Sequence, residues 1–139
     1  MKALAGLVLI AALSAGLAGT GLAAGREGSP ICRHGLVTVE RDPRGLLPLV
    51  GANLSGPAAA AALRSMRPAE KPKVTAVRRA SEDSQRGPEA KYECGTRVWQ
   101  RTMIVYITAR AFLPSASLSE RVFFVGRFRD GYHVWQIVH

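Results

Sequence analysis

The chain has 139 residues, a formal net charge of +9 at neutral pH and 47% hydrophobic residues. This length is enough for one domain, and we find no internal repeat and no low-complexity segment apart from a short alanine run. Fifteen of the 19 basic residues are arginine, which favours forked contacts to carboxylate or phosphate. The charge suits a partner that is nucleic acid, an anionic cell-wall polymer or a membrane surface. The alternative is a solvated surface, because charges of both signs are scattered along the chain.

The first residues predict an export signal. Lys2 precedes an uncharged run over 3–24 with a leucine-rich centre at 4–13, and Ala23, Ala24 and Gly25 are the small residues typical of a cleavage site. We therefore expect a signal peptide over 1–24 and a single exported domain over 25–139, secreted or periplasmic, without a stable membrane span after cleavage. The alternative is an uncleaved anchor, since the run is long enough to span a bilayer.

Cys32 and Cys94 are the two cysteines of the chain. An even number of cysteines in an exported chain predicts one disulfide. It would close a loop of 63 residues and stabilise the fold by about 4 kcal/mol in the chain-entropy model. The alternatives are two free thiols or a catalytic cysteine, although the chain has no Cys-x-x-Cys motif. We expect no metal site, because the cysteines and histidines lack ligand spacing.

The first half of the domain predicts one short strand and one helix. Residues 36–40 favour the strand, 41–45 a turn, and 46–50 an irregular or short helical piece because Pro48 interrupts it. A helix is expected over about 55–66, capped by Ser55 or Gly56 and ended by Pro68. This helix is short, so Leu63 and Met66 should pack on a sheet together with the alanines.

The second half predicts mostly extended structure. Residues 74–81 favour a strand, 82–88 a polar loop and 90–94 renewed extended structure, with Gly95 at a bulge or bend. A long half-buried strand is expected over 97–113. Its residues alternate between an apolar face with Val105 and Ile107 and a more polar face with Tyr106 and Thr108. Residues 114–117 end this strand.

Asp130 and Gly131 lie between two β-rich runs, which is the strongest short signal for a β-hairpin. A two-residue type I′ turn at these positions fixes the register and places Trp135 opposite Gly126, where the large ring covers the gap. The expected pairs on this apolar, buried face are Phe128 with His133, Gly126 with Trp135, Phe124 with Ile137, and Val122 with His139. The expected wetter face carries Arg127, Arg129, Tyr132 and Gln136.

Together these elements predict an α+β fold: one short helix packed on a four-stranded antiparallel meander, with a short N-terminal strand and one disulfide. Over about residues 55–139, above all in the hairpin with Phe124, Trp135 and Ile137, the pattern resembles cystatin-like and nuclear-transport-factor-like domains, whose curved sheets wrap around a helix. The chain lacks the long helical N-terminal half of transport factors and the protease-binding loop motif of cystatins. The resemblance therefore implies a fold and neither activity.

One set of polar residues resembles a catalytic site. His133 follows the hairpin turn, and histidine serves as a general acid or base near neutral pH. With Glu93 and Arg121 it resembles the guanyl-specific microbial ribonucleases, which are small, basic, exported α+β proteins. That resemblance implies catalytic roles for Glu93, Arg121 and His133. The chain departs from the family because the Asp-His-Tyr order and a guanine-recognition segment are absent, and Glu93 precedes the long strand. The alternative for His133 is a packed residue at a hairpin end.

Four arginines are candidates for anion binding: Arg78, Arg79, Arg127 and Arg129. The pair Arg78 and Arg79 equally suits a solvated strand edge that discourages aggregation. Trp99, Tyr106 and Trp135 offer rings for base stacking, but such residues in a sheet are usually core. The sequence has no phosphate-binding glycine loop, nucleophile elbow or metal motif, and we expect no cofactor.

Three functional hypotheses follow. The first is a non-catalytic exported module that binds an unknown protein or small molecule through a sheet face. The second is a binder of nucleic acid or another anionic polymer, which strong salt dependence of binding would distinguish from the first. The third is a small ribonuclease-like hydrolase, which would lose turnover in His133→Ala while remaining folded.

Overall fold

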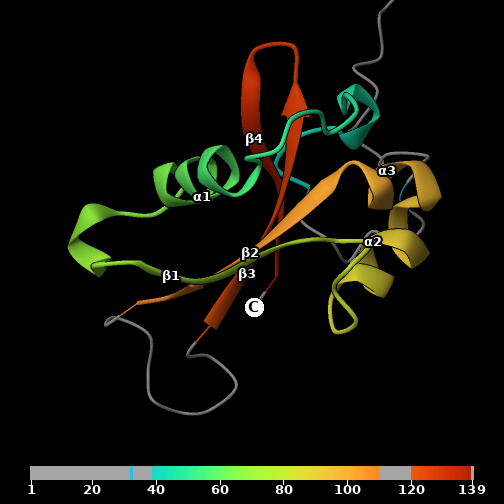
Figure 1. Ribbon diagram of the computed structural model, residues 1–139. Coiled ribbons are helices and arrows are strands. Elements are labelled where there is room, and N and C mark those ends of the chain that lie inside the picture. Colours follow the sequence, from blue (N-terminus) through green and yellow to red (C-terminus); the bar gives the residue numbers. More distant parts are fainter. Residues whose placement is uncertain (1–31, 33–38, 110–119, 139) are drawn as a thin grey trace, which may run out of the picture.

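The computed structural model describes residues 32, 39–109 and 120–138; the predicted signal peptide over 1–24 lies outside them. One antiparallel sheet contains the strands β1 (Lys73–Arg79), β2 (Thr102–Thr108), β3 (Glu120–Phe128) and β4 (Gly131–Val138). The strand order is β1-β2-β3-β4, so each strand pairs with its neighbour in sequence and the sheet is a meander (Figure 1). The predicted α+β fold with a four-stranded antiparallel sheet is thereby confirmed.

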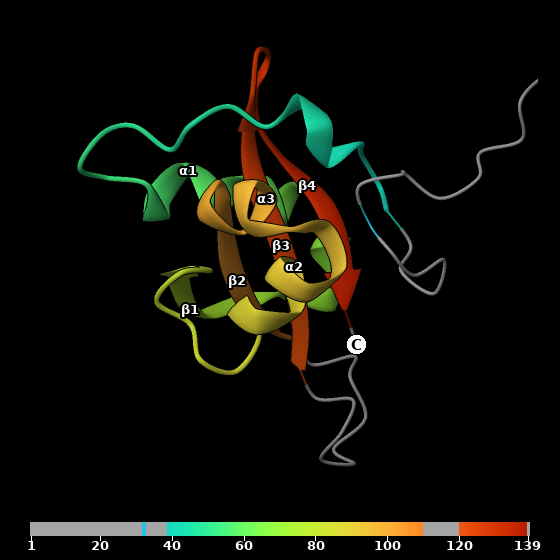
Figure 2. The same cartoon turned by 90° about the vertical axis from the view of Figure 1, so that its right-hand side faces the viewer.

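Helices cover both faces of the sheet. On one face lies α1 (Ser55–Arg64), and on the other lie α2 (Gly87–Cys94) and α3 (Thr96–Gln100), in front of the sheet in Figure 2. Two single turns of 3-10 helix, η1 (Pro43–Gly45) and η2 (Pro68–Glu70), precede and follow α1 along the chain. The sequence predicted only the helix on the first face, so the second helical layer is an addition.

Because both faces are covered, the sheet separates two cores. Val105 and Phe123 are fully buried on the face of α1, and Ile104 and Trp135 are fully buried on the face of α2 and α3. The prediction that β2 is half-buried was therefore wrong. Its more polar face, with Tyr106, packs under the second helical layer instead of facing solvent.

Residues 90–94 and 97–100 are helical, which corrects the prediction of extended structure. Ala90 and Cys94 lie four residues apart on one side of α2, and with Val98 of α3 they are each at most 2% exposed in the same core. Gly95 separates the two helices with a φ of 86°, a conformation that is costly for any residue with a Cβ atom. The helical spacing was present in the sequence, but the β-branched residues further along favoured a strand.

The β3–β4 hairpin is present, but its register differs from the predicted one. Phe128 pairs with Gly131, so Arg129 and Asp130 occupy the two central turn positions. Gly131 has a φ of 116° and neither central residue has a positive φ, which excludes the predicted type I′ turn. The register shifts again between Phe124 and Val125, so that Phe124 pairs with Gln136 and Val122 with Val138.

This register changes what covers Gly126. It pairs with His133 instead of Trp135, and a Cβ atom on Gly126 would lie 1.9 Å from Leu46 Cδ2. Leu46 therefore fills the space that the sequence assigned to the indole of Trp135. Gln136, expected on the wetter face, is only 1% exposed.

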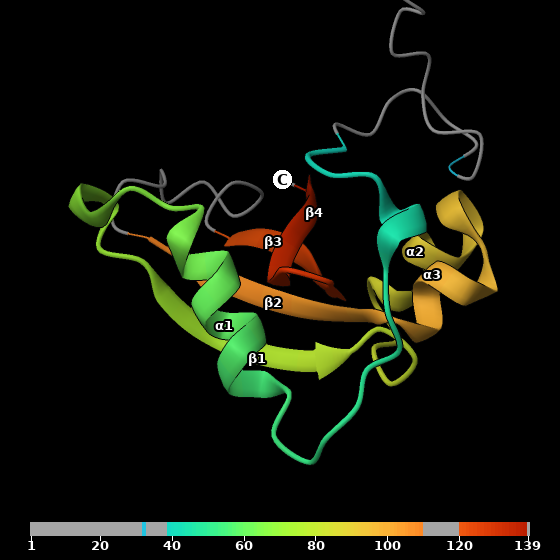
Figure 3. The same ribbon diagram turned by 90° about the horizontal axis from the view of Figure 1, so that it is seen from above.

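The segment before α1 lies along β4 and the hairpin. Val39 forms an isolated bridge with Gln136, and Leu47 forms another with Arg127. Of the short strand predicted over 36–40, only the last two residues are described, and their structure is this single bridge. Figure 3 shows the blue-green segment passing beside α3.

The helix α1 starts where the sequence predicts and ends at Arg64. Leu54 occupies the N-cap position in place of the predicted Ser55 or Gly56, and its side chain makes no capping hydrogen bond; Asn53 Oδ1 accepts a hydrogen bond from the Gly56 N–H at 3.5 Å. Met66 is buried as expected, whereas Leu63 is 37% exposed. The prediction that Leu63 packs on the sheet was wrong because the alanine side of the helix faces the core.

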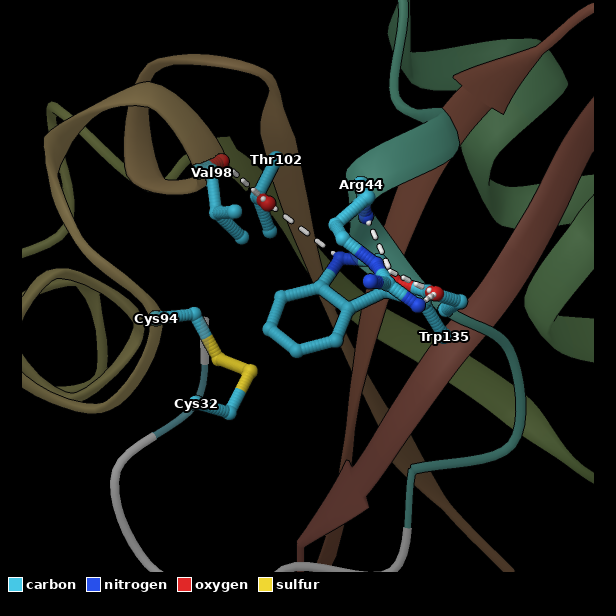
Figure 4. The surroundings of a disulfide bond; sticks show 7 residues. Cys32, Arg44, Cys94, Val98, Thr102 and Trp135 are labelled. Atoms are coloured by element: carbon cyan, nitrogen blue, oxygen red, sulfur yellow. Dashed lines mark hydrogen bonds and ion pairs between the residues drawn. A yellow bond between two sulfur atoms is a disulfide. The ribbon is translucent and has the colours of Figure 1, made fainter. Parts of the chain in front are cut away.

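Cys32 and Cys94 form the predicted disulfide, with their Cα atoms 4.0 Å apart. The disulfide lies beside Trp135 in the core under α2 and α3 (Figure 4). In the same core, Trp135 Nε1 donates to Thr102 Oγ1 at 3.2 Å, and that hydroxyl donates to the Val98 carbonyl at 2.7 Å. A disulfide is compatible with an oxidising, extracytoplasmic compartment. Among the helices that the structure describes, we find none with the length and hydropathy needed to cross a membrane.

Candidate functional site

Three parts of the chain bring arginine side chains to one hollow beside the hairpin. The segment before α1 supplies Arg41 and Arg44, α3 and its C-cap supply Arg97 and Arg101, and the hairpin turn supplies Arg129. The hollow has a volume of about 500 Å³, which is within the range of small-molecule sites. We name it the arginine pocket. Its lining is completed by Gly45, Leu46, Leu47, Phe128 and Asp130.

Backbone contacts hold the walls of the arginine pocket together. Arg101 Nη1 donates to the Leu46 carbonyl at 2.7 Å, which ties the end of α3 to the segment before α1. The Leu47 N–H donates to the Arg127 carbonyl at 2.8 Å, which ties that segment to the hairpin. Gly126 has no side chain, and Leu46 occupies the space beside it. These contacts fix three distant parts of the sequence around one hollow.

Arg41 is held over an aromatic ring by a carboxylate. Its guanidinium carbon lies 4.4 Å from the centre of the Phe128 ring, a distance at which the cation and the ring attract each other. Its Nη2 donates to both carboxylate oxygens of Asp130 at 2.9 Å. The side chains of Arg41 and Asp130 are 37% and 56% exposed, so the pair is accessible to solvent and to ligands.

Positive charge exceeds negative charge around the arginine pocket. Arg44 has a carboxylate partner, since its Nε donates to Asp42 Oδ2 at 2.6 Å, and this hydrogen bond raises the pKa of Arg44. Arg97 and Arg129 have no acidic partner within ion-pair distance among the residues that the structure describes. Five guanidinium groups thus share two nearby carboxylates, which leaves donors for an added anion.

His133 lies on the other side of the Arg41–Asp130 pair. Its Nε2 is 3.2 Å from Asp130 Oδ2, without the geometry of a hydrogen bond. The hydrogen bond from Arg41 lowers the pKa of the Asp130 carboxyl, and the charge of His133 acts in the same direction. A second hollow of about 480 Å³, which we name the histidine pocket, is lined by Arg41 and His133 together with Glu40, Arg64 and Tyr132.

The three residues implied by the ribonuclease resemblance lie in separate surroundings. Glu93 is on α2, on the face of the sheet that holds the disulfide. Arg121 Nη1 lies 3.7 Å from the sulfur of Met66, on the face that holds α1, and 3.5 Å from Glu70 Oε1. The structure therefore places Glu93 and Arg121 on opposite faces of the sheet, and His133 at the hairpin.

Of the four arginines predicted to bind anions, Arg129 lines the arginine pocket. Arg127 lies nearby, but its Nε donates to the Pro48 carbonyl at 3.1 Å. Arg78 and Arg79 lie on β1, at the edge of the sheet farthest from β4, and Arg79 Nε is 3.9 Å from Glu82 Oε1. The structure thus does not bring the four predicted residues together.

Sequence reasoning missed Arg41, Arg44, Arg97 and Arg101 as members of one site. Arg97 and Arg101 are four residues apart, and this spacing would have placed them on one side of a helix had α3 been recognised. No local signal links them to Arg41 and Arg44, because the connection depends on the contact between Leu46 and Arg101.

A second polar cluster is centred on a buried carboxylate. Asp83 is 3% exposed and accepts hydrogen bonds from the N–H groups of Gln85 and Arg86 and from the Tyr106 hydroxyl. Burial alone would raise the pKa of Asp83, but these hydrogen bonds outweigh burial and lower it. Burial and the bond to Asp83 raise the pKa of Tyr106. Trp99 Nε1 donates to the Ala80 carbonyl beside this cluster, so we regard it as structural.

The residues that the structure describes contain no group of three or more His, Cys, Asp or Glu side chains that could hold a metal ion. No family model, curated protein or solved structure matches the chain. The arginine pocket is therefore interpreted from its own geometry and charge, and the resemblance to cystatin-like domains stays a prediction.

Proposed function

We propose that the protein is a secreted or periplasmic, non-catalytic module that binds an anionic ligand in the arginine pocket. The observation that carries this proposal is the convergence of five arginines from three parts of the chain on one hollow of about 500 Å³. Guanidinium groups are weakly hydrated and present several N–H donors, which suits carboxylate, phosphate and sulfate groups.

The hydrogen-bond and ion-pair partners of the five arginines support a ligand site. They do not form a cluster in which every arginine is already paired with a carboxylate. Arg101 uses one nitrogen on a backbone carbonyl and Arg44 is paired with Asp42. Arg97, Arg101 and Arg129, which come from α3, its C-cap and the hairpin, are the three members without an acidic partner among the described residues. An anion in the hollow would meet donors from both walls.

The disulfide supports the export part of the proposal, because such bonds persist in oxidising compartments. The apolar part of the lining, contributed by Leu46, Leu47 and Phe128, would contact the uncharged body of a ligand.

The proposal is tested by titrating the protein with sodium sulfate at low ionic strength in a calorimeter. Sulfate should bind once per chain, and the double variant Arg97→Gln with Arg129→Gln should bind about tenfold or more weakly, since each charge-assisted hydrogen bond contributes about 1.5–3 kcal/mol. Absence of sulfate binding at millimolar concentrations, or unchanged affinity in the double variant, would contradict the proposal.

The matched control is the double variant Arg78→Gln with Arg79→Gln, which removes the same charge from β1. It should bind sulfate with unchanged affinity. Equal losses in the two double variants would favour the second candidate, a binder of anionic polymers that acts through the overall charge of +9. For that candidate, affinity for a labelled single-stranded RNA should fall steeply with salt in both variants alike.

A further inference from the structure

The Asp130 carboxylate already occupies the position of an anion in the arginine pocket. Arg41 Nη2 donates to both of its oxygens at 2.9 Å, and Asp130 is itself part of the pocket lining. The side chain is 56% exposed, and no backbone N–H of another described residue holds the carboxylate in place. A carboxylate held by side chains at the surface can exchange with a ligand from solution.

A second partner lies within reach of the same carboxylate. The buried Nε2 of His133 is 3.2 Å from Asp130 Oδ2, and His133 lines the histidine pocket. The contact between His133 and Asp130 lacks hydrogen-bond geometry. In this structure the carboxylate therefore accepts its side-chain hydrogen bonds from Arg41. A small rotation of the Asp130 side chain would give the histidine the better contact.

We propose that the ligand carries a tetrahedral dianionic group, phosphate or sulfate, that replaces Asp130 on Arg41 while Asp130 turns to His133. This inference rests on the proposed function. A dianion suits the site better than a carboxylate, because Arg97 and Arg129 add donors that the single carboxylate of Asp130 leaves unused. Phe128 keeps Arg41 in position during the exchange, since its ring lies under the guanidinium.

Protonation of His133 would favour the exchange. Among the described residues, five charged or titratable groups contact this histidine or line the histidine pocket with it. They are Asp130 and Tyr132 of the hairpin, Glu40 and Arg41 on the segment before α1, and Arg64 at the end of α1. Arg64 is directed to the Tyr132 carbonyl at 3.1 Å. Histidines gain their charge as the pH falls from 8 to 5, and the charged ring would attract Asp130 away from Arg41.

The first experiment compares sulfate affinity in the wild type, Asp130→Asn and Glu82→Gln. Sulfate keeps its two charges across this pH range, so changes report on the protein. Asp130→Asn should bind sulfate about two- to fivefold more tightly at pH 8, the range expected for loss of an exposed competing ion pair. Glu82→Gln changes the net charge equally but lies outside the pocket, and its affinity should not change. Equal or weaker binding in Asp130→Asn overturns the exchange.

The second experiment measures the same affinities between pH 8 and pH 5.5. Wild-type affinity should rise about two- to threefold as the pH falls. His133→Gln should abolish the rise, whereas the double variant His34→Gln with His139→Gln should retain it. In Asp130→Asn, most of this rise in sulfate affinity should be lost. An equal rise in wild type and Asp130→Asn would mean that His133 acts through its charge alone, and would overturn the exchange.

Two further probes assign the ligand group. Acetate, a planar monoanion, should bind the wild type about fivefold or more weakly than sulfate, and equal affinity overturns the assignment to a dianion. The affinity for phosphate, measured at pH 8, is then compared with the affinity for sulfate. The anion that binds more tightly identifies the group that the natural ligand carries. If sulfate binding is lost in Arg97→Gln with Arg129→Gln but is insensitive to Asp130→Asn, the proposed function stands and only this inference fails.

Discussion

Two aspartates show how the same side chain serves different purposes in this molecule. Asp83 and Asp130 both have a lowered pKa and both lie in turns. Asp83 is buried and receives two backbone N–H donors and a tyrosine hydroxyl. Asp130 is exposed and is held by the side chain of Arg41, with His133 adjacent. Backbone partners cannot move away without unfolding the turn, whereas side-chain partners can exchange.

This difference extends to the regions around the two residues. Around Asp83, Trp99 bonds to the Ala80 carbonyl, and a Cβ atom on Gly87 would lie 1.9 Å from that oxygen. The Trp99 bond joins α3 to the end of β1, and the Tyr106 bond joins the loop before α2 to β2. Around Asp130, Arg97 and Arg129 are without acidic partners among the described residues. We infer that the first region maintains the fold and that the second is available to a ligand. Four predictions test this division.

The largest effect should come from the disulfide. Replacing Cys32 and Cys94 together with serine should lower the free energy of unfolding by about 4 kcal/mol, because the unfolded chain regains the entropy of a large loop. Denaturant titration measures this change. The affinity for sulfate of the molecules that remain folded should be unaltered. A loss below about 1 kcal/mol would show that the disulfide adds little to the core beside Trp135.

Asp83→Ala should lower the free energy of unfolding by about 2–3 kcal/mol, because it leaves two N–H groups and the buried Tyr106 hydroxyl without their acceptor. Thermal or denaturant unfolding measures the loss. Asp130→Ala is the matched control at the other turn and should cost clearly less, since Arg41, its hydrogen-bond partner, is accessible to solvent. Equal losses in the two variants would remove the distinction between the regions.

The pH dependence of the free energy of unfolding should reveal the contribution of the Asp83 carboxylate. Its folded-state pKa is depressed, so its contribution is fully present above the unfolded-state pKa of about 3.9 and is lost as the pH falls through the folded-state pKa. The stability difference between wild type and Asp83→Asn should therefore be constant above pH 5 and shrink below pH 4. Melting temperatures measured from pH 2 to pH 7 test this; a difference that grows in acid would contradict it.

The smallest effect on stability should come from the arginine pocket. Arg97→Gln with Arg129→Gln should change the free energy of unfolding by no more than about 0.5 kcal/mol, because neither side chain has an ion-pair partner among the described residues. The same variant should lose sulfate binding, as proposed above. Substantial destabilisation would instead assign these arginines a structural role, and denaturant titration alongside calorimetry separates the two outcomes.

Local patterns in the sequence determined several elements of this fold. The strand β1, the helix α1 and the hairpin follow from alternation, from proline and alanine, and from Asp130 next to Gly131. The pairing of the only two cysteines followed from their number. These signals act over a few residues or by counting, so they need no knowledge of packing.

Tertiary packing decided what the sequence signals left open or misdirected. The segment over 87–100 forms two helices, which bury Ala90, Cys94 and Val98 against the sheet. The hairpin register differs from the predicted one at the turn and again between Phe124 and Val125, and Leu46, from a distant segment, fills the space beside Gly126. Leu46 also helps to form the arginine pocket, because its carbonyl accepts a hydrogen bond from Arg101 and so joins two walls of the pocket. The sequence alone determined the number of arginines and the local elements that carry them. Only long-range packing placed five of these arginines around one hollow, because no short-range interaction connects their three segments.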